Sequence, residues 1–539
     1  MPILKTSLNT VKNKIAAANA YETAITSSNT YIGIGRVVPW DGTTIPQIYD
    51  TTEELNNVFR GLVALKKINS SDINLVAPRV DWETGIEYTE YSENLDLFSY
   101  DSSTQINGTV SASSGSNVVT GSSTLFETTL AMGDFITLYG NGNTSPEVTK
   151  EIVSVLSNTS VTVNSVFSAS YSANTLYKVE NTYPKYANNY YVRNKRDQIF
   201  ICLLSSGQST VMPEINVSGD LPENPYIETS DGYKWKYLYT IPSGSKEKFL
   251  TSEWMPVITD TYVQQSAVDG RLGIFKVIDG GDGYLGGSSN SVAGIVVVRG
   301  DGTGANLTAN VYNGVVVSVS PLGNGSTNLG QNYTFADISF SDGNKTVNSN
   351  IANVIAVIAP QNGHGANPYA ALGAKNLMIS VELDSDEGNT IPISVGSQSF
   401  DYHQISIIQN PESSVEDVAY LGGTRYKAVH VIKTTSGVPN TFALDETVYQ
   451  GSNTTNYSFS GVVVNWDSNL QELWLNNVVG TYDPTAAIKA ATSGTSTYGT
   501  SITAPEYVPF TGDILYVEDR TPIHRDYYQA EQIKLVLSF

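Results

Sequence analysis

Two short segments contain the residue types that could bind a phosphate group or a metal ion. The first, GDGTGA at residues 300–305, has the glycines of a phosphate-binding loop. Such a loop needs a following helix whose amino terminus faces the phosphate, and many nucleotide sites add a Gly-Lys-Ser or Gly-Lys-Thr step. Here strand-forming residues follow and the lysine step is missing. We therefore predict a tight β-turn and no nucleotide site.

The second segment, DSDEGN at residues 384–389, gathers the carboxylates of Asp384, Asp386 and Glu387. Carboxylate oxygens are calcium ligands, but an EF-hand also needs flanking helices and a glutamate at the twelfth loop position. Val395 occupies that position. We predict a solvated turn, with an adventitious oxygen-ligand site as the alternative.

Catalytic side chains do not gather in a local motif. The histidines are dispersed, and no pair has the spacing of a helical zinc motif: His364, His403, His430 and His524. No Gly-x-Ser-x-Gly sequence marks a nucleophilic serine, and among 52 acidic residues almost any two carboxylates could be proposed as a glycosidase pair. We predict no catalytic, cofactor-binding or metal-binding residues and hence no cofactor, with a histidine site assembled by the fold as the alternative.

The aromatic residues of SDGYKWKYLYTIPSGSKEKFLTSEWMPV, residues 230–257, are more informative. Four rings alternate along a predicted strand, which should place all of them on one face: Tyr233, Trp235, Tyr237 and Tyr239. The residues between and after them are Lys234, Lys236, Leu238 and Thr240. We favour an aromatic core face, because large rings supply much of the burial energy of a sheet. A partner interface and a carbohydrate-stacking platform are the alternatives.

Composition narrows the class of partner. The chain has 539 residues, of which 52 are acidic and 30 basic, and its formal net charge is -22. Such a surface should repel phosphate backbones, so nucleic acid is not an expected partner. No run approaches the ~18 to 20 apolar residues of a membrane span, and the first 25 residues lack the apolar stretch of a secretory signal. We expect a soluble protein without membrane insertion or Sec-type export.

The elements that would position these residues are mostly strands. Short runs of Val, Ile, Tyr and Thr are broken by Gly, Asn, Asp and Ser, a pattern typical of sandwiches and barrels. The single cysteine, Cys202, excludes an internal disulfide and lies in the apolar run 199–204, where it should behave as a small core hydrophobe. The predicted fold class is mainly β, with several β-sandwich or barrel-like modules and a few short helices.

Two local patterns predict individual elements. A capping box formed by Thr51 and Glu54 precedes apolar residues at helical spacing: Leu55, Val58, Phe59, Leu62 and Val63. Asn313-Gly314 tolerates the positive φ angles of a tight turn and predicts a hairpin that pairs Leu307, Ala309 and Val311 with Val315, Val317 and Val319.

Three regions are interpreted as additional β units. In residues 106–179 the predicted strands are NVVTGSSTLF, DFITLYG, EIVSVL and SVTVNSVF. The glycine-rich region 277–343 repeats a similar turn, GGDGY and later GNGSTNLGQNY. Residues 441–500 combine strand patterns with a loop rich in Ser, Thr and Gly.

Three segments, taken in their order along the chain, resemble a known family. They are SSDINLVAPRVDWETGIEYTEY at residues 70–91, the aromatic segment at 230–257, and GDILYVEDRTPIHRD at 512–526, followed by EQIKLVLSF. Together they resemble the gene-product-eight type of baseplate wedge subunit of T4-like contractile-tail phages. This chain is much longer than the usual family member, so the β units between the matching segments are additions whose roles the family does not supply.

The resemblance also suggests how the domains are arranged. Matching segments flank residues 106–179, so the first domain should be discontinuous. The predicted domains are a wedge core of residues 1–105 plus 180–270, an inserted β domain of 106–179, a glycine-rich β module of 271–365 and a C-terminal β domain of 366–539 that carries a further insertion at about 441–500.

The resemblance implies a structural, non-enzymatic virion protein. It would belong to the viral tail of a contractile-tail bacteriophage, or myovirus, and would be made in the host bacterial cytoplasm. It would form a homodimer, bind other baseplate wedge proteins and take part in the baseplate rearrangement that triggers sheath contraction. That task needs bistable interfaces and no catalysis. A glycan- or receptor-binding tail adhesin is the alternative, and a virion-associated hydrolase is a third class.

Overall fold

The computed structural model confirms a mainly β chain with short helices. The chain forms two compact units: unit 1 comprises Met1–Ala17, Leu75–Asn376 and Phe539, and unit 2 comprises Ala18–Asn74 and Leu377–Ser538. The domain boundaries given above stay predictions. The structure describes residues 11–36, 51–91, 103–130, 135–139, 146–163, 165–167, 169–179, 190–216, 226–284, 290–293, 296–323, 328–341, 350–385, 387–394, 400–415, 418–435, 442–526 and 528–539.

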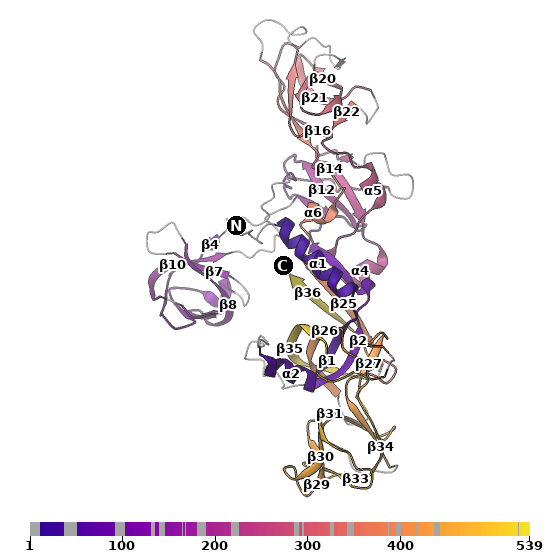
Figure 1. The fold of residues 1–539 in the computed structure, drawn as a ribbon. Coiled ribbons are helices and arrows are strands. Elements are labelled where there is room, and N and C mark those ends of the chain that lie inside the picture. The colour runs from indigo at the N-terminus through magenta and orange to yellow at the C-terminus, as the bar shows by residue number, and fades with distance from the viewer. Residues whose placement is uncertain are drawn as a thin grey trace, which may run out of the picture. The chain divides into compact units, whose positions relative to one another are not determined.

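A seven-stranded sheet in unit 1 has the order β4-β10-β5-β6-β9-β8-β7, and β10 also pairs with β7, which closes the sheet into a barrel (Figure 1). Its strands are β4 Ser103–Gln105, β5 Thr109–Ala112, β6 Val118–Ser122, β7 Phe135–Tyr139, β8 Pro146–Ser157, β9 Ser160–Val163 and β10 Tyr171–Val179. The four predicted strands of this region form, but two are shorter than predicted: the first ends at Ser122, with Phe126 beginning helix α3, Phe126–Thr129, and the fourth ends at Val163. Alternate inward residues of these strands form a hydrophobic core of their own.

A second sheet of unit 1 carries the aromatic segment. Its order is β11-β12-β14-β13, with β11 Tyr191–Arg193, β12 Gln198–Leu204, β13 Tyr226–Glu228 and β14 Lys234–Thr240. Helices α4 Ser243–Phe249 and α5 Thr261–Ser266 follow β14. Cys202 on β12 is fully buried, which confirms its prediction as a core residue, and burial raises the pKa of its thiol.

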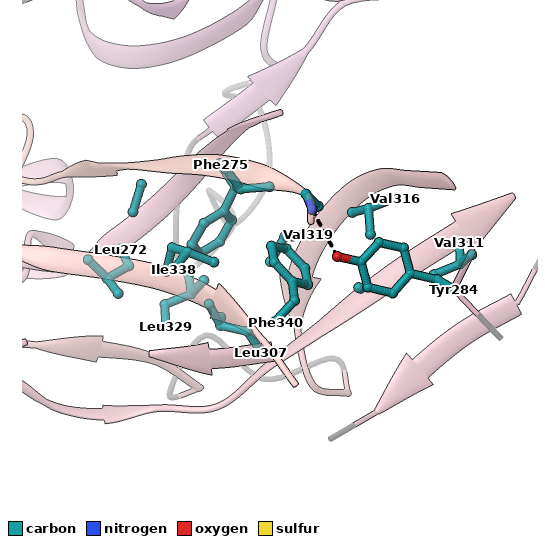
Figure 2. Close-up of a cluster of buried hydrophobic side chains, with 14 of the residues drawn as sticks. Leu272, Phe275, Tyr284, Leu307, Val311, Val316, Val319, Leu329, Ile338 and Phe340 are labelled. Atoms are coloured by element: carbon teal, nitrogen blue, oxygen red, sulfur yellow. Dashed lines mark hydrogen bonds between the residues drawn. The ribbon is translucent and has the colours of Figure 1, made fainter. Parts of the chain in front are cut away.

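The glycine-rich part of unit 1 consists of three small sheets around one core (Figure 2). The sheet β16-β24-β23-β18 contains β16 Leu272–Asp279, β18 Val296–Gly300, β23 Ala336–Phe340 and β24 Asn353–Ile358. The other two are β17-β20-β21, with β17 Asn290–Ala293, β20 Leu307–Tyr312 and β21 Val315–Pro321, and β19-β22, with β19 Thr303–Ala305 and β22 Leu329–Gln331. The tyrosines that end the two similar sequences, Tyr284 and Tyr333, both lie in this core. Tyr284 Oη accepts a 2.8 Å hydrogen bond from the Ala352 amide.

The predicted hairpin forms, but its register differs. Asn313 and Gly314 have positive φ angles, and β20 pairs with β21 across them. A register shift after Asn310 places Val311 opposite Val316 and Ala309 opposite Val319. Val316 and Val319 are therefore buried, whereas Val315 and Val317 are 38% and 53% exposed. The prediction was wrong for Val315 and Val317, because a two-residue turn pairs Val311 with Val316, and it holds for Val319, which the bulge brings opposite Ala309.

Unit 2 contains two larger sheets. The first, β27-β2-β1-β26-β35, is built from β1 Thr30–Gly35, β2 Leu62–Lys67, β26 Phe400–Gln409, β27 Arg425–Lys427 and β35 Asp513–Arg525. The second, β33-β32-β29-β30-β31-β28-β34, is built from β28 His430–Thr434, β29 Thr447–Gly451, β30 Tyr457–Asp467, β31 Glu472–Gly480, β32 Ile488–Ala490, β33 Ser496–Thr497 and β34 Gly499–Thr503. Strands β25 Asn376–Asp384 and β36 Ala530–Ser538 are neighbours.

The capping box starts helix α2, Thr52–Gly61, as predicted. The Thr51 amide donates to Glu54 Oε2 at 2.9 Å, and the Glu54 amide donates to Thr51 Oγ1 at 3.3 Å. The predicted helix was too long, because Leu62 and Val63 belong to β2. The remaining helices are α1 Val11–Thr26, α6 Pro368–Leu372 and the 3-10 turn Ser70–Asp72. Among the described residues, no helix combines the length and the apolar character that a membrane crossing requires.

Candidate functional site

The aromatic strand β14 lies inside unit 1. The rings of Tyr233, Trp235, Tyr237 and Tyr239 are each at most 2% exposed. Tyr233 and Trp235 stack with centroids 5.3 Å apart, and Phe200 on β12 meets the Tyr237 ring at 5.7 Å. This burial agrees with the predicted core face, and it leaves these rings no surface on which a partner or a sugar could stack.

The expectation that all four rings share one face was wrong. Tyr237 lies opposite Phe200, but a register shift at Leu238 places Tyr239 opposite Ile199. Neighbours on a strand point to opposite faces, so Phe200 and Ile199 lie on different sides of the sheet. The bulge therefore transfers Tyr239 to the second face, where its hydroxyl donates to the Pro256 carbonyl at 2.9 Å.

Lys236, which alternates with these rings along β14, is 1% exposed. Burial, and next the positive charge of Arg271, lowers the pKa of Lys236 to about 7. Its ammonium nitrogen lies 4.7 Å from the centre of the Tyr226 ring. This burial was not predicted from the sequence.

Two segments far apart in the sequence meet in this core. Strand β3, Ile73–Pro78, pairs with β15, Trp254–Pro256, and Met255 lies opposite Ala77. The Tyr88 ring packs edge-on against Trp235 at 5.4 Å, and the Tyr88 amide donates to Tyr233 Oη at 3.0 Å. Burial raises the pKa of Tyr88 to about 12, so its hydroxyl stays protonated and donates to the Glu83 carbonyl.

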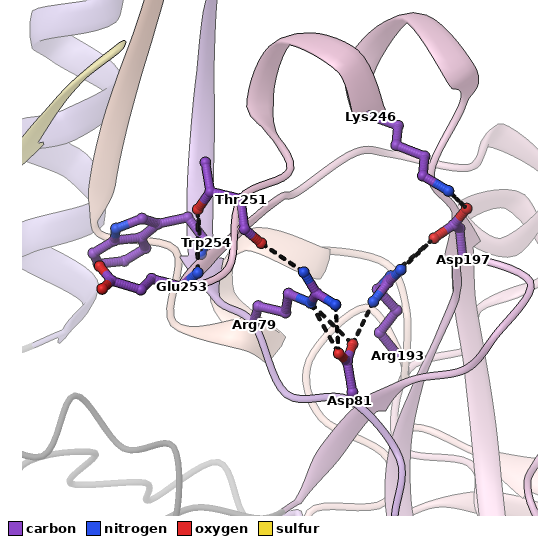
Figure 3. A network of polar contacts seen from close by, with 8 residues as sticks. All are labelled: Arg79, Asp81, Arg193, Asp197, Lys246, Thr251, Glu253 and Trp254. Atoms are coloured by element: carbon purple, nitrogen blue, oxygen red, sulfur yellow. Dashed lines mark hydrogen bonds and ion pairs between the residues drawn. The ribbon is translucent and has the colours of Figure 1, made fainter.

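A network of ion pairs continues from this junction (Figure 3). Arg79 donates to the Thr251 carbonyl at 2.8 Å and to both oxygens of Asp81. Arg193 also binds Asp81 and reaches Asp197 at 2.8 Å, and Lys246 reaches the other oxygen of Asp197 at 2.8 Å. Burial alone would raise the pKa of Asp81, but the Arg79 hydrogen bond and the charge of Arg193 outweigh it and lower that pKa.

An Asp81→Asn variant is expected to destabilise unit 1 by about 1 to 2 kcal/mol at neutral pH, since Asp81 is 40% exposed and solvent screens the pair. The folded pKa of Asp81 lies below the unfolded value of about 3.9. The carboxylate's contribution is therefore complete above the unfolded pKa and is lost as the pH falls through the folded pKa.

Thermal unfolding of both proteins from pH 7 down to pH 2 measures this dependence, and the difference between them should shrink at the acid end. Glu228→Gln is the matched control, because the Glu228 carboxylate is 66% exposed and 3.5 Å from Lys234. A difference that stays constant with pH would contradict a role for the Asp81 charge.

The two candidate loops have structural explanations. Residues 300–305 join β18 to β19 by a turn, as predicted, and Asp301 Oδ1 accepts from the Thr334 amide at 2.9 Å. At residues 384–389 the prediction of a solvated turn is wrong for Glu387, which is 5% exposed. Its carboxylate binds Lys66 and lies 3.3 Å from Arg425. Asp386 and Val395 lie outside the described residues.

The histidines remain dispersed in the structure. His364 belongs to unit 1, and His403, His430 and His524 belong to unit 2. Within the described parts of the chain, no group of three His, Cys, Asp or Glu side chains is placed to hold a metal ion. His364 nevertheless lines a small cavity that the sequence did not reveal.

Comparison with known proteins adds no family assignment. No protein-family model matches this sequence, and no curated protein matches it. The function proposed next therefore depends on the sequence segments and on how they fold.

Proposed function

We propose that the chain is a structural subunit of a phage tail baseplate wedge, non-enzymatic, located in the virion and held in the wedge as a homodimer that binds other wedge proteins. The ordered resemblance of the segments at 70–91, 230–257 and 512–526 is the starting point. A T4-like contractile tail is the assembly in which such a subunit would act.

One observation supports the proposal most: residues 75–91 and 230–257, which carry two of the matching segments, fold against each other. β3 pairs with β15, and the Arg79 amide donates to the Glu253 carbonyl at 2.7 Å. Tyr88 joins the rings of Tyr233 and Trp235. Residues that resemble a family in separate segments thus belong to one core, which is expected if those segments descend together as one structural element.

A wedge subunit also needs a scaffold that keeps its shape while its neighbours move. The buried rings of β14 and the ion pairs around Asp81 and Asp197 supply many coupled contacts in that scaffold. Partner contacts would then come from other surfaces, and permanent interfaces of this kind commonly bury about 2,000 Å² or more.

Light scattering coupled to size exclusion tests the proposal, first on the chain alone and then with the other wedge proteins of the same genome. We expect a dimer that enters a larger complex of fixed stoichiometry. A chain that stays apart from every wedge protein would contradict the proposal, and specific retention on host cells or on a glycan array would then favour an adhesin.

A further inference from the structure

A cavity of ≈ 60 Å³ lies in unit 1 beside the turn that precedes α6. Its buried wall includes Ile201, Gly363, His364 and Gly365, and the exposed residues Gln361 and Asn367 lie at its rim. One ordered water needs about 10–15 Å³ on a comparable measure, so the cavity has room for a larger polar guest.

His364 is the polar side chain of the wall. It is 5% exposed, and neither ring nitrogen has a hydrogen-bond partner. Tyr91 packs edge-on against the imidazole with centroids 5.8 Å apart, which fixes the ring beside the cavity. Burial, and next the charge of Lys236, lowers the pKa of His364 to about 3. Leaving a buried donor and a buried acceptor without hydrogen bonds destabilises the folded state. A ligand that binds the imidazole would remove this cost.

Two glycines of this wall allow close packing behind it. Gly363 and Gly365 have φ angles of +94° and +88°, a region that side chains rarely adopt. A Cβ on Gly365 would lie 2.6 Å from Val263 Cγ1 and 3.4 Å from Lys236 Cε. The side chain of Lys236 therefore passes directly behind the glycine that lines the cavity.

Two cationic side chains act on the groups of this wall. Lys236 lies opposite Ile201 in the β12–β14 pair, and paired residues share a face of the sheet, so Lys236 is on the cavity side. The charges that shift these pKa values are both cationic: Lys236 acts on His364, and Arg271 acts on Lys236. Arg271 Nε is itself buried without a hydrogen-bond partner. Buried cations favour an anion that compensates them.

We propose that this cavity binds a small tetrahedral oxyanion of the phosphate or sulfate type, which accepts a hydrogen bond from the His364 imidazole and is held by the positive field of Lys236 and Arg271. A metal cation would be repelled by the same field, and an apolar guest would leave both imidazole nitrogens without partners. The site is separate from the proposed wedge function and does not depend on it.

Binding should be linked to protonation. An anion favours the charged forms of His364 and Lys236, so their pKa values rise in the complex and protons are taken up. The Tyr226 ring lies beside Lys236, and burial raises the pKa of its hydroxyl, so this group stays neutral at neutral pH. Affinity should therefore increase as the pH falls, by up to about tenfold per pH unit for each proton taken up.

Titration of the full chain with inorganic phosphate and, separately, sulfate tests the proposal. The imidazole signals of the four histidines are followed by NMR, and the His364→Gln variant assigns the signal of interest. We expect a saturable shift of the His364 signal alone at millimolar anion, with tighter binding at pH 6 than at pH 8. No shift with either anion would overturn the proposal and leave a water-filled cavity.

Two lysine variants test whether the charge of Lys236 itself, and not the total positive charge of the strand, strengthens anion binding. Lys236→Met should weaken binding at least about tenfold, the effect of losing one close buried charge. Lys234→Met removes the same charge from the same strand, where Lys234 pairs with exposed Glu228, and should leave the affinity unchanged. Equal weakening by both variants would overturn the assignment, and the wild-type titration remains decisive if Lys236→Met does not fold.

Discussion

A double Trp235→Ala, Trp254→Ala variant is expected to lose the folded core of unit 1. Trp235 is fully buried and Trp254 is 8% exposed, and they lie on β14 and β15, two strands of the segment 230–257 that packs against residues 75–91. Removing one buried tryptophan ring costs about 3 to 5 kcal/mol, and separate sites add approximately. The sum approaches the about 5 to 15 kcal/mol that stabilises a whole domain.

Calorimetry and near-ultraviolet circular dichroism measure this loss, with each single variant alongside the double one. The chain has two compact units and need not unfold in one step, so the lost transition must be assigned to unit 1. Tyr312→Ala combined with Phe335→Ala is the matched control, because these rings are 51% and 60% exposed. A double tryptophan variant that kept normal stability and assembled with wedge proteins would show that this segment is not the structural centre we describe.

The behaviour of β14 shows what the sequence could predict about this core. Alternating rings indicated a strand and a buried aromatic face, because both depend on neighbours in the chain. The face of Tyr239 could not be predicted, since it depends on a bulge at Leu238 that appears only when β12 pairs with β14. The burial of Lys236 has another cause, because Gly365, from a distant part of the chain, packs against it.

Local signals were reliable where the interaction itself is local. The Thr51 capping box and the Asn313-Gly314 turn each join residues three or fewer positions apart, and both form as predicted. The predicted helix wrongly continued through Leu62, and the predicted hairpin missed that Val316 faces the core. At both positions the pairing between strands decides the geometry. The cavity at His364 combines residues from three separate segments, so no single motif in the sequence could reveal it.

The second large effect is expected in unit 2, where a Glu531→Gln variant should be destabilised by about 3 to 5 kcal/mol, because it leaves a buried guanidinium without its counter-charge. Arg525 is fully buried, and its Nε donates to Glu531 Oε1 at 3.2 Å. The other Glu531 oxygen accepts from Tyr402 Oη at 2.9 Å. Arg525 also donates to the Ser385 carbonyl, which cannot neutralise a charge.

The nearly isosteric glutamine keeps an acceptor oxygen, so the variant removes the charge while preserving most of the packing. The shift of the unit 2 unfolding transition is the measurement, and Glu518→Gln is the control, because its partner Arg520 is 44% exposed. Exposed pairs of that kind contribute about 0 to 1 kcal/mol.

A second substitution distinguishes the cost of an isolated charge from a loss of packing. Arg525→Met in the Glu531→Gln background removes the unpaired guanidinium and puts an apolar chain of similar length in its place. Because an apolar replacement of a buried ion pair is often neutral or stabilising, the double variant should recover most of the lost stability. If it is less stable than Glu531→Gln alone, the Arg525 side chain stabilises unit 2 through its packing and its bond to Ser385, and the charge of Glu531 is not what holds β35 and β36 in place.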